Sequence, residues 1–200
     1  MNNGRTKAVH WLNSCRQEDG KWGYVPGQKG RCEPTLFAML AGMEGDLDWL
    51  RQSKKGWWTF LIPALLARTP NSDDIRKDAI QYIIESRPPE LRCWSWVANT
   101  HSWMEPTSYA VLSLKMSGLQ SHQLVQDAVA DILDRQSYDG GWNVGVVEIF
   151  GTPLSAHLPP TGWAALALQG DQVPHQALNL LLQARQKSSP LTLSLAILAR

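Results

Sequence analysis

The chain alternates between two kinds of apolar segment, which short polar loops separate. In the first kind, apolar residues recur every three or four positions and polar residues occupy the other positions. That spacing predicts amphipathic helices with one buried face. We place these helices in five segments: residues 8–17, 47–52, 79–87, 128–136 and 177–186. They form the expected outer layer of a helical protein.

Segments of the second kind are small or apolar at nearly every position, which predicts helices buried on most sides. Each contains a proline near its start, where the first turn of a helix tolerates it. A glycine follows three of them, as expected at a helix C-terminus. These inner helices are expected at residues 34–41, 62–67, 106–114, 160–168 and 190–198.

Amphipathic and apolar segments follow one another in turn along the chain. The sequence therefore predicts about five outer/inner helix pairs, a repeat organisation in which neighbouring pairs share a core. No segment shows the strict alternation that is typical of a half-buried strand. We expect an all-α fold in a single repeat domain over residues 1–200, with the pairs arranged as a closed or curved double layer.

A tryptophan-anchored phrase occurs at two outer-helix ends. It reads QEDGKW at residues 17–22 and QSYDGGW, one residue longer, at 136–142. Asp-Gly favours a tight turn with positive φ. The indole N–H can reach a carbonyl, and the glutamine amide can donate to carbonyls at the helix end. We interpret each phrase as a connector between an outer and an inner helix, with structural roles for Asp19, Trp22, Asp139 and Trp142.

The pattern Gln-x-x-Asp-Gly-x-Trp, paired with Pro-Thr-x-x-Ala-x-Leu-x-Leu, resembles the repeat of squalene–hopene and oxidosqualene cyclases. Related phrases occur in protein prenyltransferase β-subunits. Residues 94–96 and 101–107 also resemble a repeat of bacterial cyclase-like proteins. The resemblance covers essentially the whole chain. It implies an α/α toroid, whose inner helices surround an apolar cavity for an isoprenoid chain.

The resemblance also implies where a catalytic acid should lie. Class II cyclases of this family protonate an alkene or epoxide with the middle aspartate of Asp-x-Asp-Asp, at the start of an inner helix. This chain has Glu-Pro-Thr at 33–35 and 105–107, and Pro-Pro-Thr at 159–161. Glu105 is therefore our first candidate acid and Glu33 the second. The alternative is that each glutamate complements its helix dipole, which favours the ionised form.

Aromatic residues accompany the first candidate acid, and aromatic faces stabilise cations. The alternative for this group is core packing between two helices, with the histidine as a hydrogen-bonding loop residue. The expected ligand is an apolar isoprenoid or another lipid, and the residues expected to shape its pocket are Trp96, His101, Trp103, Tyr109 and Trp163.

The resemblance to prenyltransferases raises the question of zinc, which that family binds through an aspartate, a nearby cysteine and a later histidine. Cys32 adjoins Glu33, and Cys93 precedes Glu105, but neither forms Asp-x-Cys. His157 is the nearest candidate for the histidine. Because the ligand pattern is incomplete, we expect no metal and no other cofactor.

Composition and charge indicate which partners and which cellular compartment suit this chain. The net charge of +1 gives no electrostatic reason to expect nucleic acid. Ten tryptophans against three phenylalanines indicate a recurring structural role for tryptophan. Three cysteines without Cys-x-x-Cys spacing favour free thiols in a reducing compartment. With no evident signal peptide, we expect a cytoplasmic protein that contacts membranes peripherally, if at all.

The leading hypothesis is an isoprenoid-binding, terpene cyclase-like protein that catalyses a class II-type cyclisation. The rivals are a non-catalytic lipid-binding or scaffold repeat domain, and a relative of the prenyltransferases. An incomplete toroid would expose apolar inner-helix faces. Three arrangements of the helix pairs are therefore open. The chain forms a tight ring, it is a truncated member of the family, or a partner or second copy completes the layer.

Overall fold

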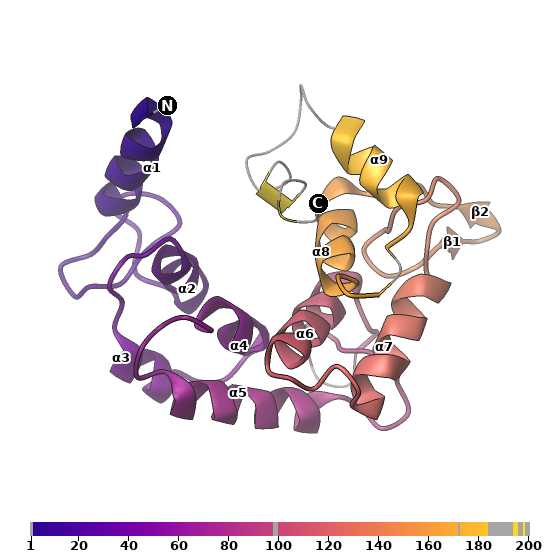
Figure 1. The fold of residues 1–200 in the computed structure, drawn as a ribbon, viewed down its shortest axis with the longest axis horizontal. Coiled ribbons are helices and arrows are strands. Elements are labelled where there is room, and N and C mark those ends of the chain that lie inside the picture. The colour runs from indigo at the N-terminus through magenta and orange to yellow at the C-terminus, as the bar shows by residue number, and fades with distance from the viewer. Residues whose placement is uncertain (1, 98–99, 172, 184–193, 196–197, 199–200) are drawn as a thin grey trace. The chain divides into compact units, whose positions relative to one another are not determined.

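The structure is a computed structural model that describes residues 2–97, 100–171, 173–183, 194–195 and 198. The chain is mostly helical, which agrees with the predicted all-α class (Figure 1). Its contacts divide it into unit 1, Met1–Ile80, and unit 2, Gln81–Arg200. The single repeat domain stays a prediction.

Unit 1 holds the first two helix pairs. Its inner elements pack together, because α2 contacts both the 3-10 helix η1 and α4. Its elements are α1 (Asn2–Ser14), α2 (Cys32–Leu40), α3 (Leu47–Gln52), η1 (Trp57–Leu61), α4 (Ile62–Leu65) and the first part of α5 (Asp73–Ser86).

Unit 2 continues the alternation of helices. Inner helix α6 packs against outer helix α7 and inner helix α8, and α8 packs against outer helix α9. Every residue of α8 from Pro160 to Ala167 is buried, whereas α7 buries only Val125, Ala128 and Ile132. The elements after α5 are α6 (Met104–Met116), α7 (Gln123–Asp134), β1 (Glu148–Ile149), β2 (Thr152–Pro153), α8 (Leu158–Ala167) and α9 (His175–Gln183).

Two predictions about elements need comment. Strands β1 and β2 pair in an antiparallel hairpin, which the sequence did not predict because each strand has only two residues. The fifth inner helix, predicted at 190–198, lies outside the described residues except for 194–195 and 198. Of the described helices, none is long and apolar enough to cross a bilayer.

The predicted connector between outer and inner helices is present, and it occurs three times. A nearly fully buried tryptophan lies after each of α1, α5 and α7. Its indole N–H donates to a carbonyl near the end of that outer helix, which also accepts from a residue three positions further along the chain. The indole donates from Trp22 to Leu12 at 3.0 Å, from Trp94 to Ile83 at 2.8 Å and from Trp142 to Ile132 at 2.5 Å.

A buried threonine hydroxyl completes each connector on the inner-helix side. The backbone N–H of Trp94 donates to Thr107 Oγ1 at 3.1 Å, and that hydroxyl donates to the Trp103 carbonyl at 2.7 Å. Thr35 and Thr161 make the same pair of bonds to their own connectors. The threonine of Pro-Thr therefore joins the tryptophan to the first turn of the inner helix.

The structure corrects the alignment of the two phrases. Isolated bridges pair Arg16 with Trp22 and Gln136 with Trp142, so the phrases have equal length and Arg16 occupies the position of Gln136. The Arg16 guanidinium lies over the Trp22 ring, 5.2 Å from its centroid. The predicted contact of glutamine with the helix end is present for Gln17, which donates to the Cys15 carbonyl at 3.2 Å. Gln136 donates within its turn instead.

Both aspartates of the phrase accept a backbone N–H, within the turn for Asp19 and across the following loop for Asp139. The carboxylate of Asp19 accepts the Lys21 backbone N–H at 3.2 Å. That of Asp139 accepts the Ala156 N–H with both oxygens, at 3.1 and 3.0 Å. Gly20 and Gly140 follow with φ of 77° and 92°, the left-handed conformation that glycine adopts without strain.

A lysine joins the other ends of the two inner helices of unit 2. Lys115 Nζ, in the last turn of α6, donates to the carbonyls of Ala167 and Gln169 at 2.7 and 3.1 Å. It also forms an ion pair with Asp171. A cation at a helix C-terminus is favoured by the helix dipole. Connectors at one end and Lys115 at the other therefore fix α6 against α8.

Removing one connector hydroxyl should destabilise the protein. Thr107→Val keeps the shape of the side chain but leaves the Trp94 N–H buried without an acceptor, which costs about 1–3 kcal/mol. We expect that decrease in the free energy of unfolding from urea titration followed by circular dichroism. Thr152→Val, at an exposed threonine, is the control and should change little. Equal effects of the two substitutions would contradict the role of the hydroxyl.

Candidate functional site

Three of the predicted binding residues form one aromatic cluster in unit 2. Tyr109 of α6 lies between Trp96 and Trp163 of α8, with ring centroids 5.9 and 4.7 Å apart and interplanar angles of 76° and 78°. Such edge-to-face contacts are favourable arrangements of aromatic rings. Tyr109 and Trp163 are only 6% and 5% exposed, and Trp96 is half-buried. The cluster is therefore mostly buried, with two of its rings on inner helices and the third on the segment that precedes α6.

Glu105 lies on α6, the helix that also contains Tyr109 of this cluster. It is half-buried in the first turn of α6, four residues before Tyr109. Residues four apart share one face of a helix, so Glu105 stands one turn from the aromatic cluster. Trp103 precedes α6 and is 36% exposed, and its backbone belongs to the connector. Glu105 is thus related to the cluster through its helical spacing from Tyr109, and Trp103 is not one of the three rings in edge-to-face contact.

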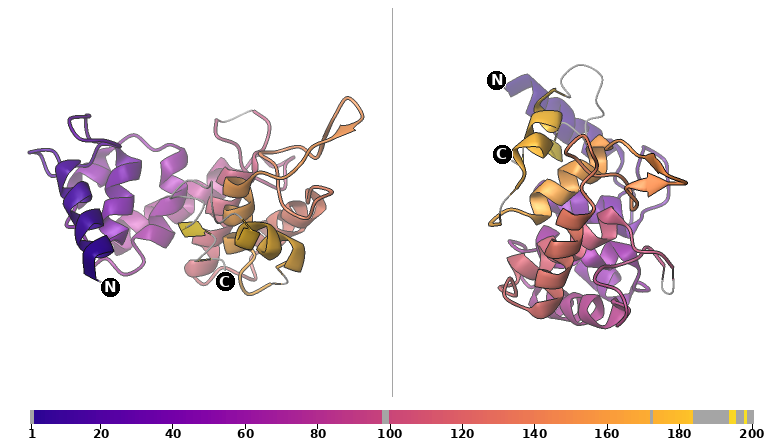
Figure 2. Two further views of the ribbon diagram at one scale, coloured as in Figure 1. Left: turned by 90° about the horizontal axis from the view of Figure 1, so that it is seen from above. Right: turned by 90° about the vertical axis from the view of Figure 1, so that its right-hand side faces the viewer.

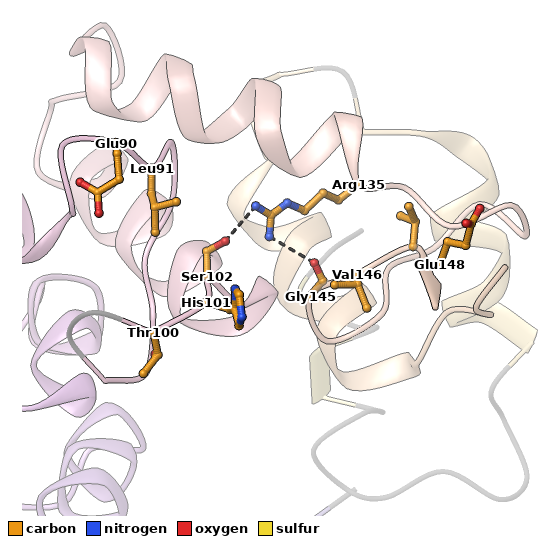
Figure 3. A pocket seen from close by; sticks show the side chains of 10 residues that line it. Glu90, Leu91, Thr100, His101, Ser102, Arg135, Gly145, Val146 and Glu148 are labelled. Carbon is orange, nitrogen blue, oxygen red and sulfur yellow. Dashed lines mark hydrogen bonds between the residues drawn. The ribbon is translucent and has the colours of Figure 1, made fainter. Parts of the chain in front are cut away.

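His101 lies elsewhere, at a cavity of about 890 Å³ in unit 2 (Figure 3). The cavity is bounded by residues 100–102, which precede α6, and by 145–148, which lead into the hairpin, with Arg135 between them. Its lining is Glu90, Leu91, Thr100, His101, Ser102, Arg135, Gly145, Val146, Val147 and Glu148. The predicted group of five binding residues is thus divided over more than one place.

Arg135 ties together the walls of this cavity. Its Nε is 2.8 Å from an Asp131 carboxylate oxygen, and its guanidinium donates to the Gly145 carbonyl at 3.2 Å and to Ser102 Oγ at 2.8 Å. It also donates to Cys93 Sγ at 3.1 Å, and burial raises the pKa of that thiol. Because Asp131 balances its charge, Arg135 is better suited to holding the two loops than to binding an anion.

The second candidate acid lies at a cavity of about 610 Å³ in unit 1. Glu33 is in the first turn of α2 and half-buried, and the Tyr24 hydroxyl donates to its carboxylate. The cavity is lined by Tyr24, Gln28, Lys29, Arg31, Cys32, Glu33, Trp57 and Trp58. Aromatic and charged side chains therefore meet here as well.

Burial shifts the pKa of the Glu33 carboxyl upward. It raises the pKa of the carboxyl above its ordinary value of 4.5, and the hydrogen bond from Tyr24 lowers it by less. Partial burial and the carboxyl in turn raise the pKa of the Tyr24 hydroxyl well above its usual range. The sequence-based expectation that the helix N-terminus keeps Glu33 readily ionised is therefore opposed by desolvation.

Among the described residues, the candidate zinc ligands of the sequence do not form a cluster in either unit. Across residues 2–97, 100–171 and the shorter described parts, no group of three or more His, Cys, Asp or Glu side chains could hold a metal ion. Cys15, Cys32 and Cys93 are all free thiols.

No family model matches the sequence, and no curated protein matches it. Among solved structures, the chain is similar to the type II terpene cyclase MstE from Scytonema. An Asp-to-Ala variant of that enzyme with merosterolic acid A, its product, aligns over 98% of this chain and 58% of its own at 15% identity, with a TM-score of 0.60. An Asp-to-Asn variant with geranylgeranyl dihydroxybenzoate, its substrate, aligns over 98% and 62% at 14% identity, with a TM-score of 0.50.

The chain has a terpene cyclase-like fold. At this level of identity the similarity concerns the fold alone, and the chain spans about three fifths of the length of the two cyclase structures.

Sequence reasoning missed three features of these sites. The sequence repeats Arg-Gln at 16–17 and 135–136, but the bridges align Arg16 with Gln136, so this repeat gave no signal for the role of Arg135. Tyr24 and the hairpin of β1 and β2 lie in loops where no motif marks them. Only the folded chain shows that Tyr24 contacts Glu33.

The upward shift in the pKa of Glu33 can be tested by measuring stability against pH. A carboxyl whose pKa is raised by folding contributes stability that is fully present below its unfolded pKa and lost as the pH rises through its folded pKa. Relative to Glu33→Gln, wild-type stability should therefore fall as the pH rises from about 4. Urea unfolding of both proteins at several pH values measures the difference, in which other carboxyl groups cancel.

The hydrogen-bond donor supplies the control. In a Tyr24→Phe background the donor that opposes burial is gone, so the fall should move to higher pH. A wild-type advantage that grows with pH would instead mean that folding lowers the pKa of Glu33.

Proposed function

We propose that this protein binds a linear isoprenoid and starts its cyclisation by protonating it, in the manner of class II terpene cyclases. The observation that carries the proposal is the Trp96–Tyr109–Trp163 cluster one helical turn from Glu105, in a chain with a terpene cyclase-like fold. Both MstE structures carry isoprenoid-derived ligands, a substrate and a product.

The chemistry needs an acid and a surface that tolerates carbocations. The proton of the Glu105 carboxyl is transferred to an alkene carbon, the π electrons form the new C–H bond, and the positive charge passes to the neighbouring carbon. An apolar ligand over the carboxyl excludes water, which favours the neutral acid before transfer. Aromatic rings then attract the cation. Water takes a proton from the cyclised cation, whose C–H electrons form the new double bond. The Glu105 carboxylate then takes up a proton from solvent, which restores the acid.

The remaining expectations about architecture and setting belong to this proposal. Closure of the helix pairs into an α/α toroid would shield the cation from water, through a tight ring, a partner or a second copy. A cytoplasmic location, with contact to a membrane surface, would suit an apolar substrate.

A non-catalytic lipid-binding domain is the second candidate. It is favoured by the absence of Asp-x-Asp-Asp from the sequence. In that case Glu105 complements the dipole of α6, and the aromatic cluster serves ligand binding and packing only. A prenyltransferase-related activity would require bound zinc, which elemental analysis of the purified protein would reveal.

Product formation from squalene and from linear prenyl substrates, followed by gas chromatography and mass spectrometry, tests the proposal. Glu105→Gln should keep ligand binding and lower the rate by about 10²–10⁴-fold, because proton transfer is lost. Glu33→Gln is the matched control, since it alters the same position of another connector. Loss of activity in Glu33→Gln alone would assign the acid to Glu33. Binding without turnover in the wild type would favour the lipid-binding domain.

A further inference from the structure

The hairpin of unit 2 exposes an apolar tip. Phe150 is fully exposed at 103%, and Val146, Val147 and Ile149 are 50%, 39% and 47% exposed. In both views of Figure 2 the strand arrows stand away from the helices of unit 2. We call residues 146–150 the apolar tip. Scattered exposed apolar residues are ordinary, but five consecutive positions with four large apolar side chains are not.

The exposure does not come from a loose loop. β1 and β2 pair Glu148 with Pro153 and Ile149 with Thr152, and the Leu154 N–H donates to the Val147 carbonyl at 2.8 Å. On the side of the hairpin away from its turn, Asn143 donates to the Ser155 carbonyl at 2.8 Å, and Asp139 accepts from the Ala156 N–H. The fold therefore holds the tip outward through a hydrogen-bonded stem.

The turn itself departs from ordinary hairpin chemistry. Phe150 and Gly151 have φ of 49° and 78°. The first of these positions usually takes Asn, Asp or Gly, because a bulky side chain rarely adopts positive φ. A phenylalanine there places a large apolar group at the outermost point of the hairpin, at some cost in backbone strain.

The size of the tip argues against a stable protein interface. A buried phenylalanine contributes about 150–250 Å², and the other three side chains are already about half covered. Stable protein interfaces bury about 800 Å² on each partner. A bilayer interface requires less, because it can take up a few projecting apolar side chains without matching a surface.

The charged residues near the apolar tip indicate which lipid headgroups it can contact. The sequence has no lysine or arginine between Arg135 and Arg185, and Glu148 is the charged residue of the tip. The tip therefore offers no cation to anionic lipid, and its insertion would depend on apolar burial. At its base Val146, Val147 and Glu148 also line the cavity of about 890 Å³.

We propose that the apolar tip inserts into the interface of an electrically neutral lipid bilayer and sets the cavity at its base against the membrane. The proposal extends the proposed function without depending on catalysis. A chain with no cyclase activity would still bind bilayers in this way.

Co-sedimentation of the full chain with sucrose-loaded phosphatidylcholine vesicles tests the proposal. The wild type should bind, and Phe150→Ser should weaken partition by at least about tenfold, as expected for removing a buried phenylalanine from an apolar phase. Raising the salt or adding phosphatidylserine should not strengthen binding. Met116→Ser is the matched control: Met116 is 49% exposed at the opposite end of α6, and its variant should bind like wild type.

A second measurement reports on insertion itself. In a Cys32→Ser background, an environment-sensitive fluorophore attached to Phe150→Cys should shift to the blue on adding phosphatidylcholine vesicles, and one attached to Met116→Cys should not. Cys15 and Cys93 are buried, which limits their labelling.

Four outcomes would overturn the proposal. They are absence of wild-type binding to phosphatidylcholine, binding that needs anionic lipid and weakens with salt, equal effects of Phe150→Ser and Met116→Ser, and self-association that Phe150→Ser abolishes without vesicle binding. The last, measured by analytical ultracentrifugation, would make the tip an interface between protein chains.

Discussion

The buried hydrogen bond from each connector tryptophan to a threonine hydroxyl is the constraint on which the rest of the structure depends. It fixes the first turn of an inner helix against the end of the preceding outer helix, because both partners are buried and neither can turn to water. In α6 that first turn contains Glu105, and the next contains Tyr109. The connector therefore fixes the two helical turns that contain the candidate acid and one ring of the aromatic cluster.

The tryptophan and the threonine fix the two ends of each connecting loop, so the length of the loop between them can vary. Trp22 and Thr35 are 13 residues apart, as are Trp94 and Thr107, but Trp142 and Thr161 are 19 apart. The longer loop contains the hairpin, and its first part forms one wall of the larger cavity. The same constraint that makes the helices alike thus permits one loop to acquire a cavity wall and an exposed apolar tip.

The sequence predicted what is periodic and local. Helical spacing identified the outer and inner helices, and Asp-Gly with tryptophan identified the connector. The alignment of the two phrases was wrong by one residue, because Arg16 occupies the position of Gln136 while Gln17 makes the contact expected of the glutamine. Contacts between distant loops were not predictable: no local pattern brings Tyr24 to Glu33, or Arg135 to Ser102 and Gly145.

Those loop contacts bear directly on the chemistry. Glu33 and Glu105 occupy equivalent positions, two residues before a connector threonine, and Pro159 takes that place in the third connector. Burial beside a cavity raises the pKa of Glu33, and a hydrogen bond from Tyr24 lowers it by less. Glu105 instead lies four residues before Tyr109 of the aromatic cluster. Because the helix position is shared, the surroundings that distinguish the two carboxyl groups come from the loops rather than from the repeat.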